Sequence, residues 1–134
     1  MKVVLDTNVV VSAFLSPAGT PAVIVRLVLK GDLDICINTA LLAEYEQVLV
    51  RSKFSDKIHH SDIQRFIEII HNIGTKIDAV PSQTDFIDEA DRKFYDVAKV
   101  ADALLITGNK KHYPMEPFIL EPAAFLKIHM NESR

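Results

Sequence analysis

The sequence has a single cysteine and no long apolar run, and each scarcity excludes a class of protein. Cys36 cannot form an internal disulfide, and its place in the apolar run of residues 35–37 predicts a buried, unreactive thiol. No apolar run approaches the roughly 20 residues that a membrane-spanning helix needs. We therefore expect a protein of the reducing cytoplasm that does not enter a membrane.

Repeats, low-complexity segments and internal linkers are also absent from the sequence. The 134 residues suffice for about one domain, so we expect residues 1–134 to form a single domain. Excess positive charge is lacking as well: the formal net charge is −3, whereas proteins that bind nucleic acids are usually basic. This charge does not exclude a nuclease, because bound divalent cations would invert the local field.

What the sequence does contain is a regular alternation of strand-like and helix-like segments. Short apolar runs predict strands over residues 2–5, 34–38, 76–80, 103–107 and 118–120. Amphipathic segments predict helices over residues 8–15, 22–30, 39–51, 62–72 and 86–101, and a last helix that starts at Pro122. We expect Asn8 and Thr39 to cap two of these helices. The alternation predicts an α/β fold, a three-layer α/β/α sandwich around a mostly parallel sheet of four to five strands.

Polar side chains follow several of the predicted strands. In a sheet of this kind, ligands bind beyond the carboxyl ends of the parallel strands. We therefore expect one edge of the sheet to collect the polar residues that end these strands or begin the next helix, which are Asp6, Thr39, Glu44, Thr107 and Asn109. The alternative for Asp6 is that it only caps the helix that follows it.

Asp91 is the most informative acidic residue of the predicted helix over residues 86–101. At about 100° per residue, the apolar side chains of this helix form one stripe, and Asp91 falls inside it near Ile87 and Phe94. A carboxylate that faces the core is costly unless it is paired or binds a metal. Asp91 is therefore a candidate ligand, with a buried salt bridge as the alternative, whereas Asp96 lies nearly opposite the stripe and is expected to face solvent.

The predicted helix over residues 39–51 offers two acidic candidates. Glu44 and Glu46 both lie about 100° from the centre of its apolar face, on opposite flanks, so periodicity does not choose between them. Glu44 is nearer to the start of the helix and thus to the edge of the sheet. Carboxylates that gather there would repel each other unless a hard divalent cation such as Mg²⁺ binds between them.

Four segments of the chain resemble, in order and spacing, the motifs of PIN-domain proteins. They are residues 4–9 (Val-Leu-Asp-Thr-Asn-Val), 42–49 (Leu-Ala-Glu-Tyr-Glu-Gln-Val-Leu), 88–94 (Asp-Glu-Ala-Asp-Arg-Lys-Phe) and 105–114 (Leu-Ile-Thr-Gly-Asn-Lys-Lys-His-Tyr-Pro). The resemblance covers nearly the whole chain. Within the family, the chain is similar to the branch regarded as toxin components of toxin–antitoxin systems, the VapC-like proteins.

The resemblance implies a PIN fold and a ribonuclease that depends on Mg²⁺ or Mn²⁺. It also implies a cytoplasmic protein, a homodimer and a small antitoxin partner that occludes the site. By position, the acidic ligands would be Asp6, Glu44 and Asp91, which selects Glu44 over Glu46. Thr7, Asn8 and Thr107 match polar motif positions that support the site, and Thr39 joins them from its expected place at the sheet edge.

One position departs from the common pattern of the family. Asn109 stands where many PIN domains have a fourth aspartate. Its amide oxygen can bind a water or a hard cation but brings no negative charge, so a second metal would bind more weakly and activity would fall. We expect metal ligation by three carboxylates plus Asn109. Five nearby basic residues are candidates for contacts with RNA phosphates, with a solvated charged loop as the alternative: Arg92, Lys93, Lys110, Lys111 and His112.

The sequence leaves two other functions open beside that of a ribonuclease toxin. Asn109 also suits a binding module that has kept the fold but lost hydrolysis. An aspartate directly after the first strand suits a phosphotransfer enzyme that uses Asp6 as its nucleophile. Such enzymes typically carry a second aspartate two residues later, where this chain has Asn8.

Overall fold

The computed structural model describes residues 1–51 and 56–132, and it contains the alternation that the sequence predicts. The strands are β1 (Lys2–Leu5), β2 (Asp34–Ile37), β3 (Thr75–Lys76), β4 (Leu104–Ile106) and β5 (Ile119–Leu120). The α-helices are α1 (Thr7–Leu15), α2 (Thr20–Leu29), α3 (Thr39–Leu49), α4 (His60–Ile73), α5 (Arg92–Ala101) and α6 (Pro122–Glu132). Two short 3-10 helices, η2 (Glu89–Asp91) and η3 (Lys110–His112), lie in the C-terminal half.

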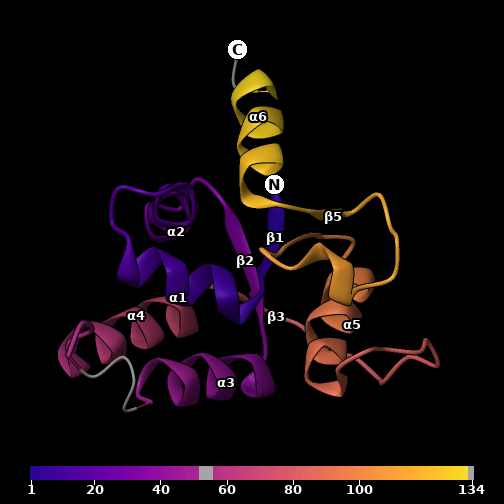
Figure 1. Ribbon diagram of the computed structural model, residues 1–134, viewed down its shortest axis with the longest axis horizontal. Coiled ribbons are helices and arrows are strands. Elements are labelled where there is room, and N and C mark those ends of the chain that lie inside the picture. The colour runs from indigo at the N-terminus through magenta and orange to yellow at the C-terminus, as the bar shows by residue number, and fades with distance from the viewer. Residues whose placement is uncertain (52–55, 133–134) are drawn as a thin grey trace.

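The five strands form one sheet in the order β3-β2-β1-β4-β5, and every pairing is parallel. β1 is the central strand, and Val3, Val4 and Leu5 are completely buried, as expected for a strand covered on both faces. Figure 1 shows α1, α2 and α4 on one side of β1 and β2 and α5 on the other. The predicted α/β fold with a parallel sheet between helical layers is confirmed.

The strand order also determines where a site can form. The chain adds β2 and β3 on one side of β1 and then β4 and β5 on the other, so the direction of strand addition reverses at β1. In open α/β sheets, ligands bind beyond the carboxyl ends of the strands at such a reversal. The residues that follow β1 and β4 are therefore placed where a functional site is expected.

Several predicted element boundaries were wrong. The residues at the N-caps are Asp6 and Asn38, not Asn8 and Thr39, and the Asn38 side chain accepts a hydrogen bond of 2.9 Å from the Leu41 backbone N–H. β3 contains two residues where five were expected. The predicted helix over residues 86–101 begins only with the 3-10 turn η2, because the Asp88 side chain accepts from the Ala90 backbone N–H and starts the turn there.

Two further expectations concern apolar residues. Cys36 is completely buried in β2, as predicted. Among the described residues, no single helix is long and apolar enough to cross a membrane; α1 and α2 pass that test of length and composition only as a pair bent by 102°.

Candidate active site

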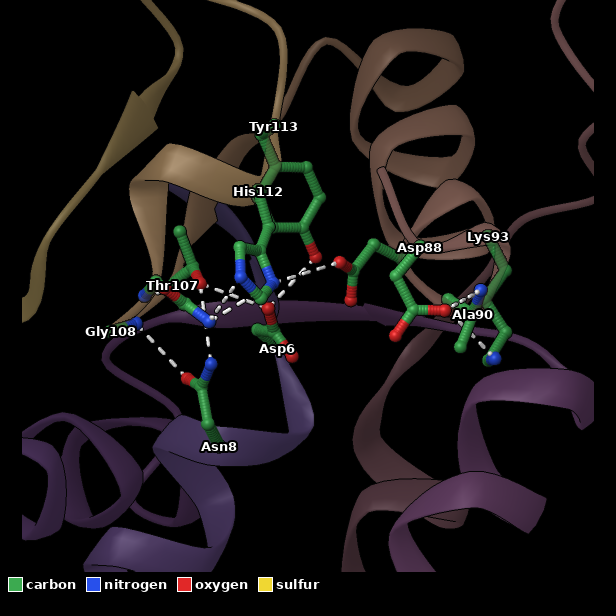
Figure 2. Close-up of polar contacts among 11 residues, drawn as sticks. Asp6, Asn8, Asp88, Ala90, Lys93, Thr107, Gly108, His112 and Tyr113 are labelled. Carbon is green, nitrogen blue, oxygen red and sulfur yellow. Dashed lines mark hydrogen bonds and ion pairs between the residues drawn. The ribbon is translucent and has the colours of Figure 1, made fainter. Parts of the chain in front are cut away.

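Asp6 directly follows β1 and is buried, with 5% of its surface exposed. Its backbone N–H continues the pairing of β1 with β4 by donating to the Ile106 carbonyl at 3.0 Å. Its Oδ2 accepts hydrogen bonds from the Tyr113 hydroxyl at 2.8 Å and from the Thr107 hydroxyl at 2.9 Å. Figure 2 shows both donors converging on this carboxylate. Asp6 at the end of the central strand is therefore the fixed centre of the site.

Asn8 links the residue that follows β4 to the first turn of α1. Its Oδ1 accepts from the Gly108 backbone N–H at 3.0 Å, and its Nδ2 lies 3.5 Å from the Thr107 hydroxyl oxygen (Figure 2). The same oxygen of Thr107 accepts from the Asn109 backbone N–H at 3.0 Å. The first and fourth sequence segments are thus joined by hydrogen bonds, with Thr107, completely buried, at the centre.

Glu44 reaches the site from α3. One carboxylate oxygen accepts a hydrogen bond from the Thr7 hydroxyl, and the other lies 2.5 Å from the Lys93 ammonium nitrogen. Glu46 instead accepts from Gln64 on α4 at 3.1 Å. Of the two acidic candidates that periodicity left open, Glu44 is the one that faces Asp6 and α1.

Asp91 is the last residue of η2, and its Oδ2 is buried. Within the described part of the chain this atom has no hydrogen-bond partner; the Nδ1 of His112 lies 3.7 Å away. Burial raises the pKa of Asp91 to about 6, and the negative charge of Asp6 adds to the shift. Burial likewise raises the pKa of Asp6, while the hydrogen bonds from Tyr113 and Thr107 oppose that rise.

The structure corrects the argument that singled out Asp91. Ile87 does not belong to the apolar stripe, because it precedes the helix and 77% of its surface is exposed. Asp91 faces the other carboxylates from a 3-10 turn rather than from the core side of an α-helix. Asp96, expected in solvent, is buried with 6% exposed and accepts from the Ser82 backbone N–H at 3.2 Å, because the loop before η2 covers it.

Three of the other predicted site residues lie differently from the expectation. Thr39 is exposed and lines a separate small hollow with Ile37 and Lys76, away from the carboxylates. Arg92 directs its guanidinium to Glu89 and Ser82 rather than into the site. The Asn109 amide is exposed, and its Nδ2 lies 3.0 Å from the His112 ring.

Lys110 and Lys111 are exposed on η3 beside the site, where we expected cations. Tyr113, which sequence reasoning did not select, is buried with 7% exposed and contacts Asp6 directly. The only signal for it was its place within the fourth motif, in a segment predicted to be irregular.

A hollow of about 480 Å³ opens beside these carboxylates, between α1, α3 and η2. Thr7, Asn8, Glu44 and Asp91 line it. The buried, unbonded oxygen of Asp91 and the mutual repulsion of Asp6, Glu44 and Asp91 fit a divalent cation as the missing partner. Among the described residues, however, no three acidic, histidine or cysteine side chains converge closely enough to hold an ion as they stand. Ligation therefore requires at least one side chain to move.

Comparison with known proteins assigns the chain to a family. The PIN domain model matches residues 2–111, and the chain belongs to this family. It is 29% identical over 113 residues to the uncharacterized protein MJ1680 of Methanocaldococcus jannaschii, covering 82% of this chain and 72% of that protein. Its fold is similar to a chain in the crystal structure of VapBC2 from Rickettsia felis bound to a DNA fragment from their promoter. The TM-score is 0.56 at 20% identity, over 90% of this chain and 97% of the other.

Proposed function

We propose that this protein is a metal-dependent endoribonuclease that hydrolyses RNA phosphodiesters and serves as the toxin of a toxin–antitoxin pair. The observation that carries the proposal is the cluster of the buried Asp6 carboxylate with the partly buried Glu44 and Asp91 carboxylates at the carboxyl ends of the central strands, in which one Asp91 oxygen has no hydrogen-bond partner among the described residues. Membership of the PIN family supports a nuclease.

The residues that would hold Mg²⁺ or Mn²⁺ are Asp6, Glu44 and Asp91, with Asn109 at the margin. A bound ion would supply positive charge that lowers the pKa of an attacking water and offsets the charge of the phosphodiester. Tyr113 and Thr107 hold Oδ2 of Asp6 in place, and Oδ1 is the oxygen to which neither hydroxyl donates. Burial raises the pKa of Tyr113 far above its usual value, so its hydroxyl remains a hydrogen-bond donor at any working pH.

The substrate and partners belong to the same proposal. Lys110 and Lys111 lie exposed beside the cluster and suit contacts with RNA phosphates. The fold neighbour comes from a VapBC2 complex, which supports an antitoxin partner for this chain. A cytoplasmic homodimer completes the proposal.

The decisive experiment incubates the purified protein with single-stranded and hairpin RNA in the presence of Mn²⁺ or EDTA. We expect cleavage only with the metal and a loss of at least about 100-fold in the Asp6→Asn variant, because one ligand charge disappears at the centre of the site. Asp102→Asn is the matched control: it removes the same charge from the exposed turn at the far end of α5, where Asn also tolerates the left-handed conformation (φ 54°). Equal cleavage by wild type and Asp6→Asn would refute the proposal.

Asn109 favours a second candidate, a PIN-fold binding module without hydrolysis. Its side chain contacts His112 and supplies no charge to the cluster. Under this alternative, the wild type binds RNA without cutting it, and Asn109→Asp restores cleavage.

A further inference from the structure

Lys93 forms an ion pair with Glu44, one of the proposed metal ligands. It is the second residue of α5, and its Nζ lies 2.5 Å from one oxygen of Glu44 while donating to the Ala90 carbonyl at 2.9 Å. Figure 2 shows the Lys93 side chain folded back over the η2 turn. Its side chain is 28% exposed and that of Glu44 is 21% exposed, so water screens this ion pair only in part.

With this contact, each oxygen of Glu44 has one partner. The other oxygen accepts the hydrogen bond from Thr7. A divalent cation that takes Glu44 as a ligand would therefore compete with the Lys93 ammonium at one oxygen or share the other with the Thr7 hydroxyl. Lys93, which we expected to contact RNA, thus contacts Glu44, a proposed metal ligand.

The charges of the cluster point to the same competition. Asp6, Glu44 and Asp91 carry three negative charges when ionised, and Lys93 adds one positive charge. Asn109 occupies the fourth corner of the family pattern with no charge. With histidine neutral, these three carboxylates and Lys93 sum to a charge of −2, which one divalent cation neutralises and a second would overcompensate.

We propose that Lys93 competes with the divalent cation for Glu44, and that Lys93 and Asn109 together hold the site to one ion. The inference rests on the metal site of the proposed function and goes beyond it by assigning a positioning role to Lys93. While the cation is absent, the ammonium keeps Glu44 in place and offsets the repulsion among the carboxylates.

The first test is a calorimetric titration of the metal-free protein with Mn²⁺. We expect one ion per wild-type chain and affinity about tenfold higher in Lys93→Met, because the competing charge is removed. Lys99→Met is the control: it removes the same charge from the same helix, beside Tyr95 rather than Glu44, and should change the affinity less than twofold. Unchanged or weaker binding by Lys93→Met would overturn the proposal.

A double-mutant cycle separates the specific contact from general charge. In the Glu44→Gln background, Lys93→Met should no longer raise the Mn²⁺ affinity, since the carboxylate for which the ammonium competes is gone. A gain of the same size in that background would overturn the proposal. Lys93→Gln, a polar neutral substitution, replaces Lys93→Met throughout if the methionine variant fails to fold.

The second test addresses the number of ions. Lys93→Met combined with Asn109→Asp should bind two Mn²⁺ per chain, and electron paramagnetic resonance should show the exchange-coupled signal of a manganese pair. Two ions in the wild type, or one ion in the double variant, would contradict the assigned limit. These measurements need no RNA. A wild type that binds Mn²⁺ without cutting RNA refutes the proposed function, whereas a wild type that cuts RNA while Lys93→Met binds no more tightly refutes only the role of Lys93.

Discussion

The Asp6 carboxylate carries both of its side-chain hydroxyl donors on the same oxygen. Thr107 and Tyr113, which both lie between β4 and β5, donate to Oδ2, so neither hydroxyl occupies the other oxygen. Two hydrogen bonds to a buried carboxylate favour its charged form and oppose the effect of burial on its pKa. At the scale of single residues, the site depends on neutral hydroxyls as much as on charges.

Tyr113→Phe tests this arrangement. Removing the hydroxyl leaves a buried carboxylate with one donor fewer, so the free energy of unfolding at pH 8 should fall by about 1–3 kcal/mol in urea denaturation without metal. Tyr95→Phe is the control, because its hydroxyl lies 3.3 Å from Glu116 at a partly buried position, and it should cost less than about 1 kcal/mol. Equal costs for the two variants would show that the Tyr113 bond does not support Asp6.

Sequence reasoning proposed the three acids that the structure places near one another, but not the Tyr113 hydroxyl that bonds to Asp6. Asp6 was predictable because a buried strand ends there and the fold directs that end to the site. Tyr113 was not, because an aromatic residue in an irregular segment has no periodic neighbours from which its direction can be read. The same limit applies to Lys93, whose partner Glu44 lies 49 positions earlier in the sequence.

At the scale of elements, the segment before α5 shows why boundaries escaped prediction. Residues 86–101 have a helical apolar pattern, but Asp88 bonds to the Ala90 backbone N–H and starts a 3-10 turn before the α-helix begins. A 3-10 turn advances about 120° per residue, so side chains before it lose their phase with α5. Ile87 was therefore assigned to the wrong environment, whereas Asp96 was misassigned for another reason: the loop before η2 covers it.

Gly74 lies where α4 passes into β3, at a close approach between elements. A Cβ at this position would lie 2.6 Å from the Ile70 carbonyl oxygen and 2.7 Å from Ile37 Cδ1. Gly74→Ala should therefore push α4 away from β2 and lower the free energy of unfolding by about 1–3 kcal/mol, measured by urea denaturation. A Cβ at Gly108 would lie 3.4 Å from its nearest neighbour, the Asn8 Oδ1, so Gly108→Ala should lower the free energy of unfolding clearly less. The reverse order of the two costs would contradict this packing argument.

At the scale of the whole molecule, the parallel topology was the most predictable feature. Apolar runs too short for helices, separated by helix-length segments, leave few arrangements other than parallel strands with crossover helices. The order β3-β2-β1-β4-β5 is not written in any local pattern, yet it is what brings Asp6 beside Thr107 from a distance of 101 residues. The fold thus brings the acids together, and their mutual repulsion lowers the stability of the whole molecule.

The burial and mutual repulsion of the acids predict how the stability of the protein depends on pH. The pKa of Asp91 is about 6 in the folded protein against 3.8 for the ordinary group, so the folded state binds the proton more tightly. Ionised Asp91 therefore destabilises the metal-free protein fully above pH 6, and this destabilisation disappears as the pH falls toward 3.8.

Asp91→Asn should melt at a higher temperature than wild type at pH 8 in EDTA, and this advantage should shrink between pH 6 and pH 4. Millimolar Mn²⁺ should reverse the order at pH 8, because only the wild type keeps the ligand and gains binding free energy. If Asp91→Asn raised the melting temperature equally at pH 4 and pH 8, ionised Asp91 would not be the group that destabilises the metal-free protein.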